Sequence, residues 1–212
     1  MNRLPKCKHH KKKFIPKYKF QTHCLSDDEC IKAFNEFVKS EKEKQRVKQW
    51  QKEKKAIKES LKTKSDFEKE LQILINTIVR LIDKGSFCHS TKKPLNDKFD
   101  AGHVFSVGGN PTIRFNLFNI YAQSVYANQY LSGDQINFLA VLSEVYGIEH
   151  KEYVLSLKSR YNLIKLSQED LKDKIKIARQ IVKELQKADL TYSAKIRLEL
   201  RKKYNERLGI YG

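Results

Sequence analysis

A long stretch of polar residues constrains the fold of this chain more than any other feature. From Ile31 to about Thr63 neither proline nor glycine interrupts the sequence, and most residues are Lys, Glu or Gln. Apolar residues cluster only at its start, at helical spacing, and are sparse afterwards. This composition predicts one long solvated helix with ion pairs between residues i and i+4. Two roles stay open for it: an arm that contacts DNA, or a spacer.

Positive charge is concentrated in the same third of the chain. The 212 residues carry a net charge of +18, and residues 1–64 hold 20 Lys or Arg against 8 Asp or Glu. Because each cation near a phosphate releases condensed counterions, this balance favours a polyanionic partner; a merely soluble, lysine-rich protein is the alternative. No apolar run reaches the ~20 residues of a transmembrane helix, and no apolar core follows the basic amino terminus as in a signal peptide. We therefore expect a cytoplasmic protein with no membrane partner.

The rest of the chain combines strong helix patterns with one glycine-containing region. A capping box at Ser65-x-x-Glu68 begins a helix with an apolar face that ends near Gly85. Two β-favourable runs, Val104–Val107 and Thr112–Phe115, predict a hairpin, with Gly108-Gly109-Asn110-Pro111 as its turn. Further helices are expected at about residues 134–147, 149–159, 167–188 and 191–208.

These patterns predict an α+β fold that is mostly α. A small ββα hairpin-helix core is flanked by long helices and preceded by a zinc-binding knuckle. We divide the chain into a Cys/His segment (1–30), a basic extended helix or linker (31–64), the core with its packing helices (65–165) and a C-terminal helical region (166–212).

Four metal-binding side chains lie in two close pairs near the amino terminus. The pairs are Cys7-x2-His10 and Cys24-x5-Cys30, with thirteen residues between them. Zinc takes four such ligands in a tetrahedron, and two turns that present two ligands each are the usual solution. His9 and His23 are alternative ligands, and unmetallated thiols are the alternative state. Because this segment has too little apolar content to order itself, we expect a structural zinc ion.

Three polar residues in the hairpin region have the spacing of a nuclease ββα unit. They are His103, Asn119 and Asn128, and Asp100 lies just before the first. In such a unit a histidine on the first strand deprotonates water, and a polar residue on the second strand accepts its other N–H. A helix residue helps to hold one divalent cation that offsets phosphate charge. We expect His103 and Asn119 to be catalytic, and Asp100 and Asn128 to hold Mg²⁺ or Mn²⁺.

Other polar side chains are candidates for contacting nucleic acid. Arg114 and Asn116 alternate with apolar residues, so we expect them on one strand face, where they contact phosphate or brace the loop. The basic run Lys11, Lys12 and Lys13 offers further phosphate contacts.

The central motifs resemble the core of the NinG family of bacteriophage recombination proteins, also called Rap in lambda-type phages. They are Asp100-Ala101-Gly102-His103, Arg114-Phe115-Asn116-x-x-Asn119-Ile120 and Asn128-Gln129-Tyr130-x-Ser132-Gly133. The cysteine segment is similar to that family's amino-terminal cluster, so the likeness spans most of the chain and is strongest at about residues 99–133. The resemblance implies a phage- or prophage-encoded, structure-selective endonuclease with an HNH-like core. Its substrates in the bacterial host are then branched DNAs such as Holliday junctions and D-loops.

The chain departs from that family where two C-x2-C pairs bind a second zinc ion. The corresponding residues read Cys88-His89-Ser90-Thr91 and Ser124-Val125-Tyr126-Ala127, so only Cys88 remains. One thiolate cannot hold zinc, and we expect Val125 and Ala127 to pack in its place. Leu131 stands where the family has a lysine. Gly102 stands where many HNH sites carry a metal ligand, so either Asp100 reaches the metal or His103 is itself a ligand.

Our leading hypothesis is a metal-dependent, HNH-type DNA endonuclease that acts on branched or single-strand-containing DNA, with His103 as general base. The alternative is a non-catalytic DNA-binding or architectural protein that retains a degenerate nuclease core, which predicts salt-sensitive binding without cleavage. A third hypothesis, a zinc-dependent protein-interaction module, leaves the central motif unused. Symmetric cutting of a junction requires two active sites, which a homodimer supplies.

Overall fold

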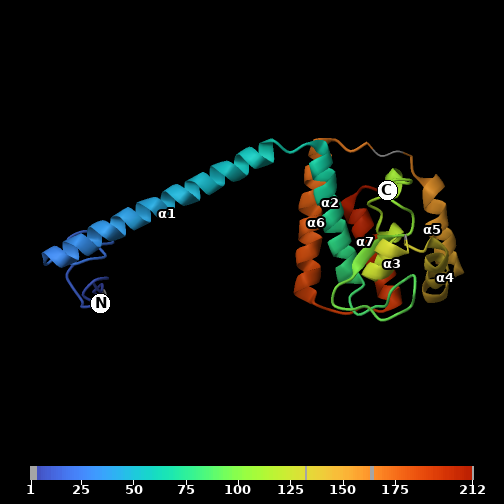
Figure 1. Ribbon diagram of the computed structural model, residues 1–212, viewed down its shortest axis with the longest axis horizontal. Helices are drawn as coiled ribbons and strands as arrows, with labels where there is room; N and C mark the ends of the chain where they lie inside the picture. Colours follow the sequence, from blue (N-terminus) through green and yellow to red (C-terminus); the bar gives the residue numbers. More distant parts are fainter. Residues whose placement is uncertain (1–3, 132, 163–164, 212) are drawn as a thin grey trace. The chain divides into compact units, whose positions relative to one another are not determined.

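The computed structural model describes residues 4–131, 133–162 and 165–211 (Figure 1). The chain forms two compact units, Met1–Leu61 and Lys62–Gly212. The described residues are mostly helical with one two-stranded sheet, so the expected mostly-α, α+β fold is confirmed. The expected division after residue 64 lies near the boundary between the units, whereas those after residues 30 and 165 fall inside a unit. None of the described helices is both long and apolar enough to cross a membrane.

The first unit contains one long helix, α1 (Asp28–Ser60). Asp27 caps its amino terminus by accepting a hydrogen bond from the backbone N–H of Cys30 at 2.8 Å. The helix therefore begins three residues before the predicted Ile31. Cys30 is the one fully buried residue among its 33, which extend roughly 50 Å at ~1.5 Å per residue. The expectation of a long solvated helix is confirmed.

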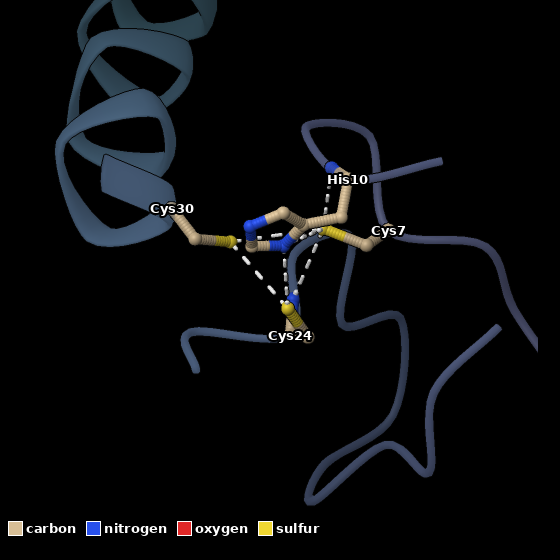
Figure 2. A group of neighbouring side chains, drawn as sticks. All are labelled: Cys7, His10, Cys24 and Cys30. Atoms are coloured by element: carbon tan, nitrogen blue, oxygen red, sulfur yellow. Dashed lines mark hydrogen bonds between the residues drawn. The ribbon is translucent and has the colours of Figure 1, made fainter. Parts of the chain in front are cut away.

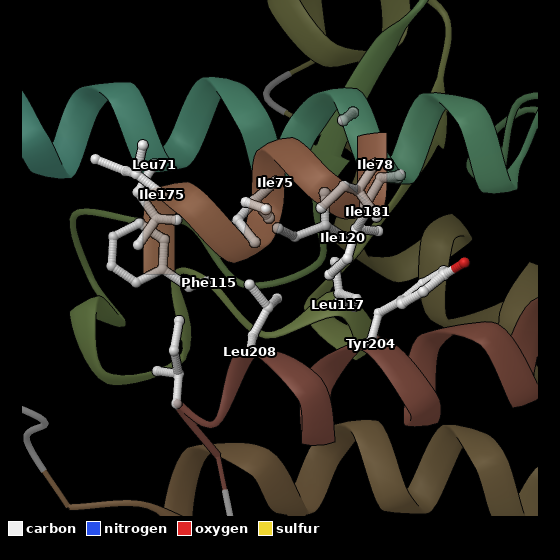
Figure 3. Packing of buried hydrophobic residues seen from close by; sticks show 14 of the residues in the cluster. Leu71, Ile75, Ile78, Phe115, Leu117, Ile120, Ile175, Ile181, Tyr204 and Leu208 are labelled. Carbon is white, nitrogen blue, oxygen red and sulfur yellow. The ribbon is translucent and has the colours of Figure 1, made fainter. Parts of the chain in front are cut away.

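Three helices of the second unit enclose its main hydrophobic core. They are α2 (Lys64–Ile82), α6 (Gln168–Ala188) and α7 (Ala194–Leu208). α2 and α6 each bury an apolar stripe at helical spacing, and Figure 3 shows Leu71 and Ile75 of α2 in one cluster with Ile175 and Ile181 of α6. The predicted C-terminal helices are thus part of this core.

The two long core helices both begin with capping boxes. Ser167 and Asp170 form the box at the start of α6, where a helix was expected from residue 167. At α2 the box is formed by Thr63 and Asp66, not by the predicted Ser65 and Glu68. The prediction was wrong by two residues because α2 begins at Lys64, which leaves Ser65 already inside the first turn.

A hairpin followed by a short helix lies against this core. β1 (Asp100–His103) pairs antiparallel with β2 (Ile120–Gln123), and α3 (Val125–Tyr130) follows, so the ββα order is present. The predicted strands at Val104–Val107 and Thr112–Phe115 are wrong. Both lie in the connecting loop, which contains the short helices η1 (Pro111–Ile113) and η2 (Leu117–Asn119). The side chain of Asn116 accepts from the Phe118 N–H, a local bond that favours a turn over a strand.

Two further helices, α4 (Gln135–Tyr146) and α5 (Ile148–Arg160), contribute to a second hydrophobic cluster. Successive residues of a strand point to opposite faces, and accordingly Ile120 joins the main core while Tyr121 joins the second cluster. The hairpin is therefore packed on both faces by helices, and its functional side chains are confined to its edges and ends.

A buried ion pair fastens the hairpin to the core helices. Arg201 of α7 and Asp83, just after α2, are both fully buried and are joined at 2.7 and 2.9 Å. Asp83 also accepts the N–H of Ala122 at 2.8 Å, and Arg201 donates to the carbonyls of Leu117 and Ile120. Burial raises the pKa of Asp83, but the Arg201 guanidinium, His89 and the Ala122 N–H together outweigh burial, so the net shift is downward.

Candidate functional site

His103 ends β1 and faces α2. Its Nε2 lies 3.0 Å from the backbone carbonyl of Arg114 and 3.4 Å from Nε2 of Gln72. A carbonyl can only accept, so Nε2 carries the proton and Nδ1 keeps a lone pair. Burial lowers the pKa of His103, against a smaller upward effect of the Arg114 carbonyl. The imidazole is therefore neutral at neutral pH, and Nδ1 is a candidate general base.

Asn119 is fully buried and forms its hydrogen bonds away from the imidazole. Its Oδ1 accepts from the Phe105 N–H at 2.9 Å, and its Nδ2 donates to the carbonyls of Phe105 and Ile113 at 3.1 and 3.3 Å. The predicted orienting contact to His103 is therefore wrong, because the Arg114 carbonyl fills that position. Asn119 instead ties together the loop that presents this carbonyl.

The structure brings Asp100 and Asn128 together. Asn128 Nδ2 donates to Asp100 Oδ2 at 2.9 Å, and Gln129 Nε2 lies 3.4 Å from the same oxygen. The Asn128 group that faces Asp100 is thus the amide nitrogen, which cannot ligate a cation. Only rotation of the Asn128 amide would bring its oxygen beside the carboxylate, as a pair of oxygen ligands for Mg²⁺ requires. Asp100 and His103, three residues apart on β1, point to opposite faces and lie roughly 10 Å apart.

Gly102 leaves space for a buried glutamine that crosses β1. A Cβ at this position would lie 1.9 Å from Oε1 of Gln123. Gln123 is fully buried, and its Nε2 donates to Ser90 Oγ at 2.9 Å and to the Gly133 carbonyl at 2.7 Å. Residue 102 therefore cannot supply the metal ligand that many HNH sites carry immediately before the base.

Arg114 and Asn116 do not share an exposed strand face. The Arg114 guanidinium is half-buried, 3.4 Å from Oε1 of Gln72 and 3.5 Å from Oε2 of Glu68, so it lies on the same side as His103. Asn116 is fully buried and accepts a hydrogen bond from Asn205 of α7 at 3.0 Å. The predicted nucleic-acid contact of Asn116 is therefore wrong, whereas a phosphate contact of Arg114 stays a prediction.

Gln72 belongs to the candidate site but was not predicted from the sequence. It is a half-buried polar residue of α2 whose amide lies beside both His103 and Arg114, although it precedes His103 by 31 residues. In the sequence Gln72 is marked only by its place next to the apolar residues that α2 buries. Only the packing of α2 on the hairpin reveals that it belongs to the site.

The predicted Cys/His cluster assembles in the first unit. The ligand atoms of Cys7, His10, Cys24 and Cys30 all lie within 4.8 Å of one another (Figure 2). Cys30 Sγ is 3.6 Å from the sulfurs of Cys7 and Cys24, and His10 Nδ1 is 3.1 Å from Cys24 Sγ. Tetrahedral Zn–S bonds of ~2.3 Å place sulfurs roughly 3.8 Å apart. The cluster can therefore hold a metal ion, consistent with structural zinc.

Neighbouring groups orient these ligands. His10 Nε2 lies 3.0 Å from a carboxylate oxygen of Asp27, so it donates there and Nδ1 faces the sulfurs. Burial raises the pKa of the Cys7 thiol, but backbone N–H groups outweigh it and lower the pKa to about 5. The alternative ligands lie elsewhere: His9 is exposed, and His23 packs against two phenylalanine rings of α1. The basic run Lys11, Lys12 and Lys13 is exposed beside the cluster.

The turn around Cys7, which we call the first knuckle, has the same backbone hydrogen bonds as a turn around Cys88, the second knuckle. In residues 6–13 and 87–94 the cysteine N–H donates to a lysine carbonyl at 2.8 and 2.9 Å, and its carbonyl accepts from a lysine N–H at 2.8 Å. The second turn carries one cysteine, Cys88, and the described residues form no second metal-binding group. Cys88 Sγ instead accepts from the Ser124 N–H at 3.3 Å, and Ala127 is fully buried nearby. The expected packing at Ala127 is confirmed.

The chain is similar to proteins of bacterial viruses. A family model described as "Bacteriophage Lambda NinG protein" matches residues 2–189. Proteins named ninG from Salmonella phage P22 and Escherichia phage lambda are 32% and 30% identical over 102 residues, or 48% of this chain. Each alignment covers 50% of the relative, so the chain spans about half the length of the curated relatives it matches. No solved structure matches.

Proposed function

The chain belongs to the NinG family of bacteriophage proteins, and we propose that it is a metal-dependent endonuclease that cuts branched DNA in phage recombination. The observation that carries the proposal is the state of His103, a neutral imidazole at the end of a ββα hairpin with Nδ1 free to accept a proton. The net charge of +18 supplies attraction for DNA. We place the reaction in the cytoplasm of the bacterial host.

In this proposal His103 is the general base. Nδ1 takes a proton from a water molecule as the water oxygen attacks phosphorus, and the bond from phosphorus to the leaving deoxyribose oxygen breaks. The leaving oxygen takes a proton from solvent, while Nε2–H stays hydrogen-bonded to the Arg114 carbonyl and stabilises the imidazolium. Asp100 and Asn128 are the residues that would hold a divalent cation, which offsets phosphate charge. The Arg114 guanidinium, on the imidazole side, is placed to contact a neighbouring phosphate.

The cleavage test uses a labelled four-way junction with Mg²⁺ or Mn²⁺. We expect His103→Ala to lower the single-turnover rate by roughly 10²- to 10⁴-fold while leaving junction binding intact. His9→Ala, which removes an exposed imidazole, is the matched control and should cut normally. Equal cutting by the wild type and His103→Ala would refute the assignment of the base.

The alternative function is non-catalytic DNA binding. Two observations favour it: the second knuckle has lost its ligands, and His103 and Asp100 lie on opposite faces of β1. It predicts that the wild type binds junctions without metal-stimulated cutting, with an affinity that falls steeply as salt rises. Binding without cleavage under every divalent cation tested would therefore select this alternative.

We also propose that the ion in the first unit is zinc and that it orders residues 4–30. Elemental analysis should find one zinc per chain. Cys30→Ser should abolish it, whereas Cys88→Ser, which removes another buried cysteine, should leave it unchanged. Equal zinc contents in the two variants would contradict the assignment.

A further inference from the structure

A second cleft lies in the same unit, apart from His103 and Asp100. It has a volume of about 600 Å³ and is bounded by η2, α5, α7 and the residues after α7. This size falls within the roughly 300–1,000 Å³ of small-molecule sites. Four aromatic side chains line it: Phe118, Tyr153, Tyr161 and Tyr211. Nothing in the proposed cleavage mechanism uses it.

The four aromatic rings of the cleft form two edge-to-face pairs. Phe118 and Tyr153 meet edge to face, with centroids 5.2 Å apart and planes at 84°. Tyr161 and Tyr211 do the same at 5.0 Å and 64°. Phe118, Tyr153 and Tyr161 are only half-buried. Partly exposed aromatic rings at the wall of a cleft favour a flat π-system as the occupant.

The charged side chains of the cleft match a nucleotide better than a purely apolar ligand. Arg160 and Lys202 are exposed, and the Arg160 guanidinium lies 4.9 Å from the Tyr153 ring centroid. These cations can pair with phosphate. Glu199 and Glu206 are also exposed at the cleft, and a carboxylate accepts from the exocyclic amino groups of bases.

One side chain that lines the cleft, Tyr211, also holds the loop that positions His103. Tyr211 Oη donates to the Thr112 carbonyl and accepts from the Phe115 N–H, at 3.0 and 3.2 Å. Residues 112–115 include Arg114, whose carbonyl holds the imidazole of His103. A wall of the cleft is therefore fixed to the segment that presents the general base.

From these observations we propose that the cleft binds an unpaired nucleobase displaced at a DNA branch point. The proposal rests on the proposed function, because it names the feature by which a branched substrate is distinguished from a duplex. A base in a closed duplex is stacked and cannot enter, so the cleft favours junctions, flaps and D-loops. The full chain, with its basic first unit intact, is the protein to test.

Photo-crosslinking identifies the residues that contact the unpaired nucleobase. A three-way DNA junction carries 5-iodouracil at one unpaired position next to the branch, and crosslinked peptides are identified by mass spectrometry. We expect adducts at Tyr153 or Tyr161. Adducts confined to the exposed rings of Tyr130 on α3 or Trp50 on α1 would overturn the proposal, because those rings lie outside the cleft.

Affinity measurements test the energetic contribution. Tyr153→Ala should weaken junction binding roughly 5- to 100-fold, the range of one base–aromatic stacking contact, and leave duplex binding unchanged. Arg160→Glu alters only an exposed side chain, so it tests the cleft without risk to folding, and it should weaken junction binding more than duplex binding. Tyr130→Ala is the matched control.

The outcomes separate this proposal from the proposed function. If the wild type binds junctions but gives no adduct in the cleft, or if Tyr153→Ala and Tyr130→Ala bind alike, the cleft proposal is wrong and the nuclease proposal stands. If the wild type binds no DNA at all, both are wrong. If His103→Ala retains the adducts without cutting, both are supported.

Discussion

Breaking the Asp83–Arg201 pair should destabilise the second unit more than any other single ion-pair change we consider. In Arg201→Met, Asp83 stays fully buried and loses both hydrogen bonds from Arg201, while its hydrogen bond from the Ala122 N–H remains. Removing one member of a buried ion pair costs about 3–5 kcal/mol because the other charge is left uncompensated. For a unit of about 150 residues this corresponds to a fall in Tm of roughly 6–20 °C.

Arg207→Met is the matched control on the same helix. Arg207 pairs with Glu184, but both side chains are partly exposed, so the loss should be no more than ~1 kcal/mol. Near-UV circular dichroism of tyrosine monitors the second unit selectively, since nine of the ten tyrosines lie in it and Trp50 lies in the first. Equal stability losses in the two variants would refute the argument.

The same pair makes a prediction about pH. The pKa of Asp83 is lowered in the folded state, so its stabilising contribution is complete above the unfolded value of ~3.9 and is lost as pH falls through the folded value. In Arg201→Met the buried carboxylate loses its partner, and protonation then relieves an uncompensated charge. Because burial without a partner raises the pKa of that carboxyl above its unfolded value, the stability gap between wild type and variant should begin to narrow above about pH 4 and continue to narrow on further acidification.

Three further changes have expected outcomes that the same unfolding assay or metal analysis can check. Gly102→Ala should lose roughly 1–3 kcal/mol, because its Cβ meets buried Gln123, whereas Gly108→Ala, with open space around it, should not. Burial lowers the pKa of His89 to about 4, so the unfolded chain binds the extra proton below pH 6.5 and stability should fall by about 2 kcal/mol from pH 7 to 5; His89→Gln should flatten this slope. A triple variant that supplies the three missing cysteines of the second knuckle should bind one additional zinc by elemental analysis, and an unchanged zinc content would show that the turn no longer fits a metal. Its substitutions are T91C, S124C and A127C.

Helix positions and the cysteine cluster could be predicted because their determinants are local. The apolar stripe of α2, the capping box of α6 and the ligand spacing of Cys7 and His10 are all read within a few residues. The hairpin was misplaced because β-propensity depends on the partners of a strand. β1 contains Asp, Ala, Gly and His, yet it pairs because Gln123 and helices on both faces accommodate it.

The buried polar contacts of α7 could not be predicted, for a related reason. Arginine is almost never fully buried unless it is paired, and the partner of Arg201 lies 118 residues earlier in the chain. Asn205 likewise holds Leu117 and Asn116 across 88 and 89 residues. A charged helix sequence gives no sign of which of its polar residues will point inward.

The two knuckle turns differ in what holds them in place. The first knuckle is in a unit where α1 buries little, so we propose that a bound metal ion is the main source of its order. The second is built into a unit whose core already holds β2 and α3, with Ala127 fully buried and Cys88 bonded to the Ser124 N–H. There packing and backbone hydrogen bonds hold the turn, and the hairpin that carries His103, without a set of metal ligands. Removal of zinc from this protein should therefore unfold residues 4–30 while the second unit keeps its thermal transition.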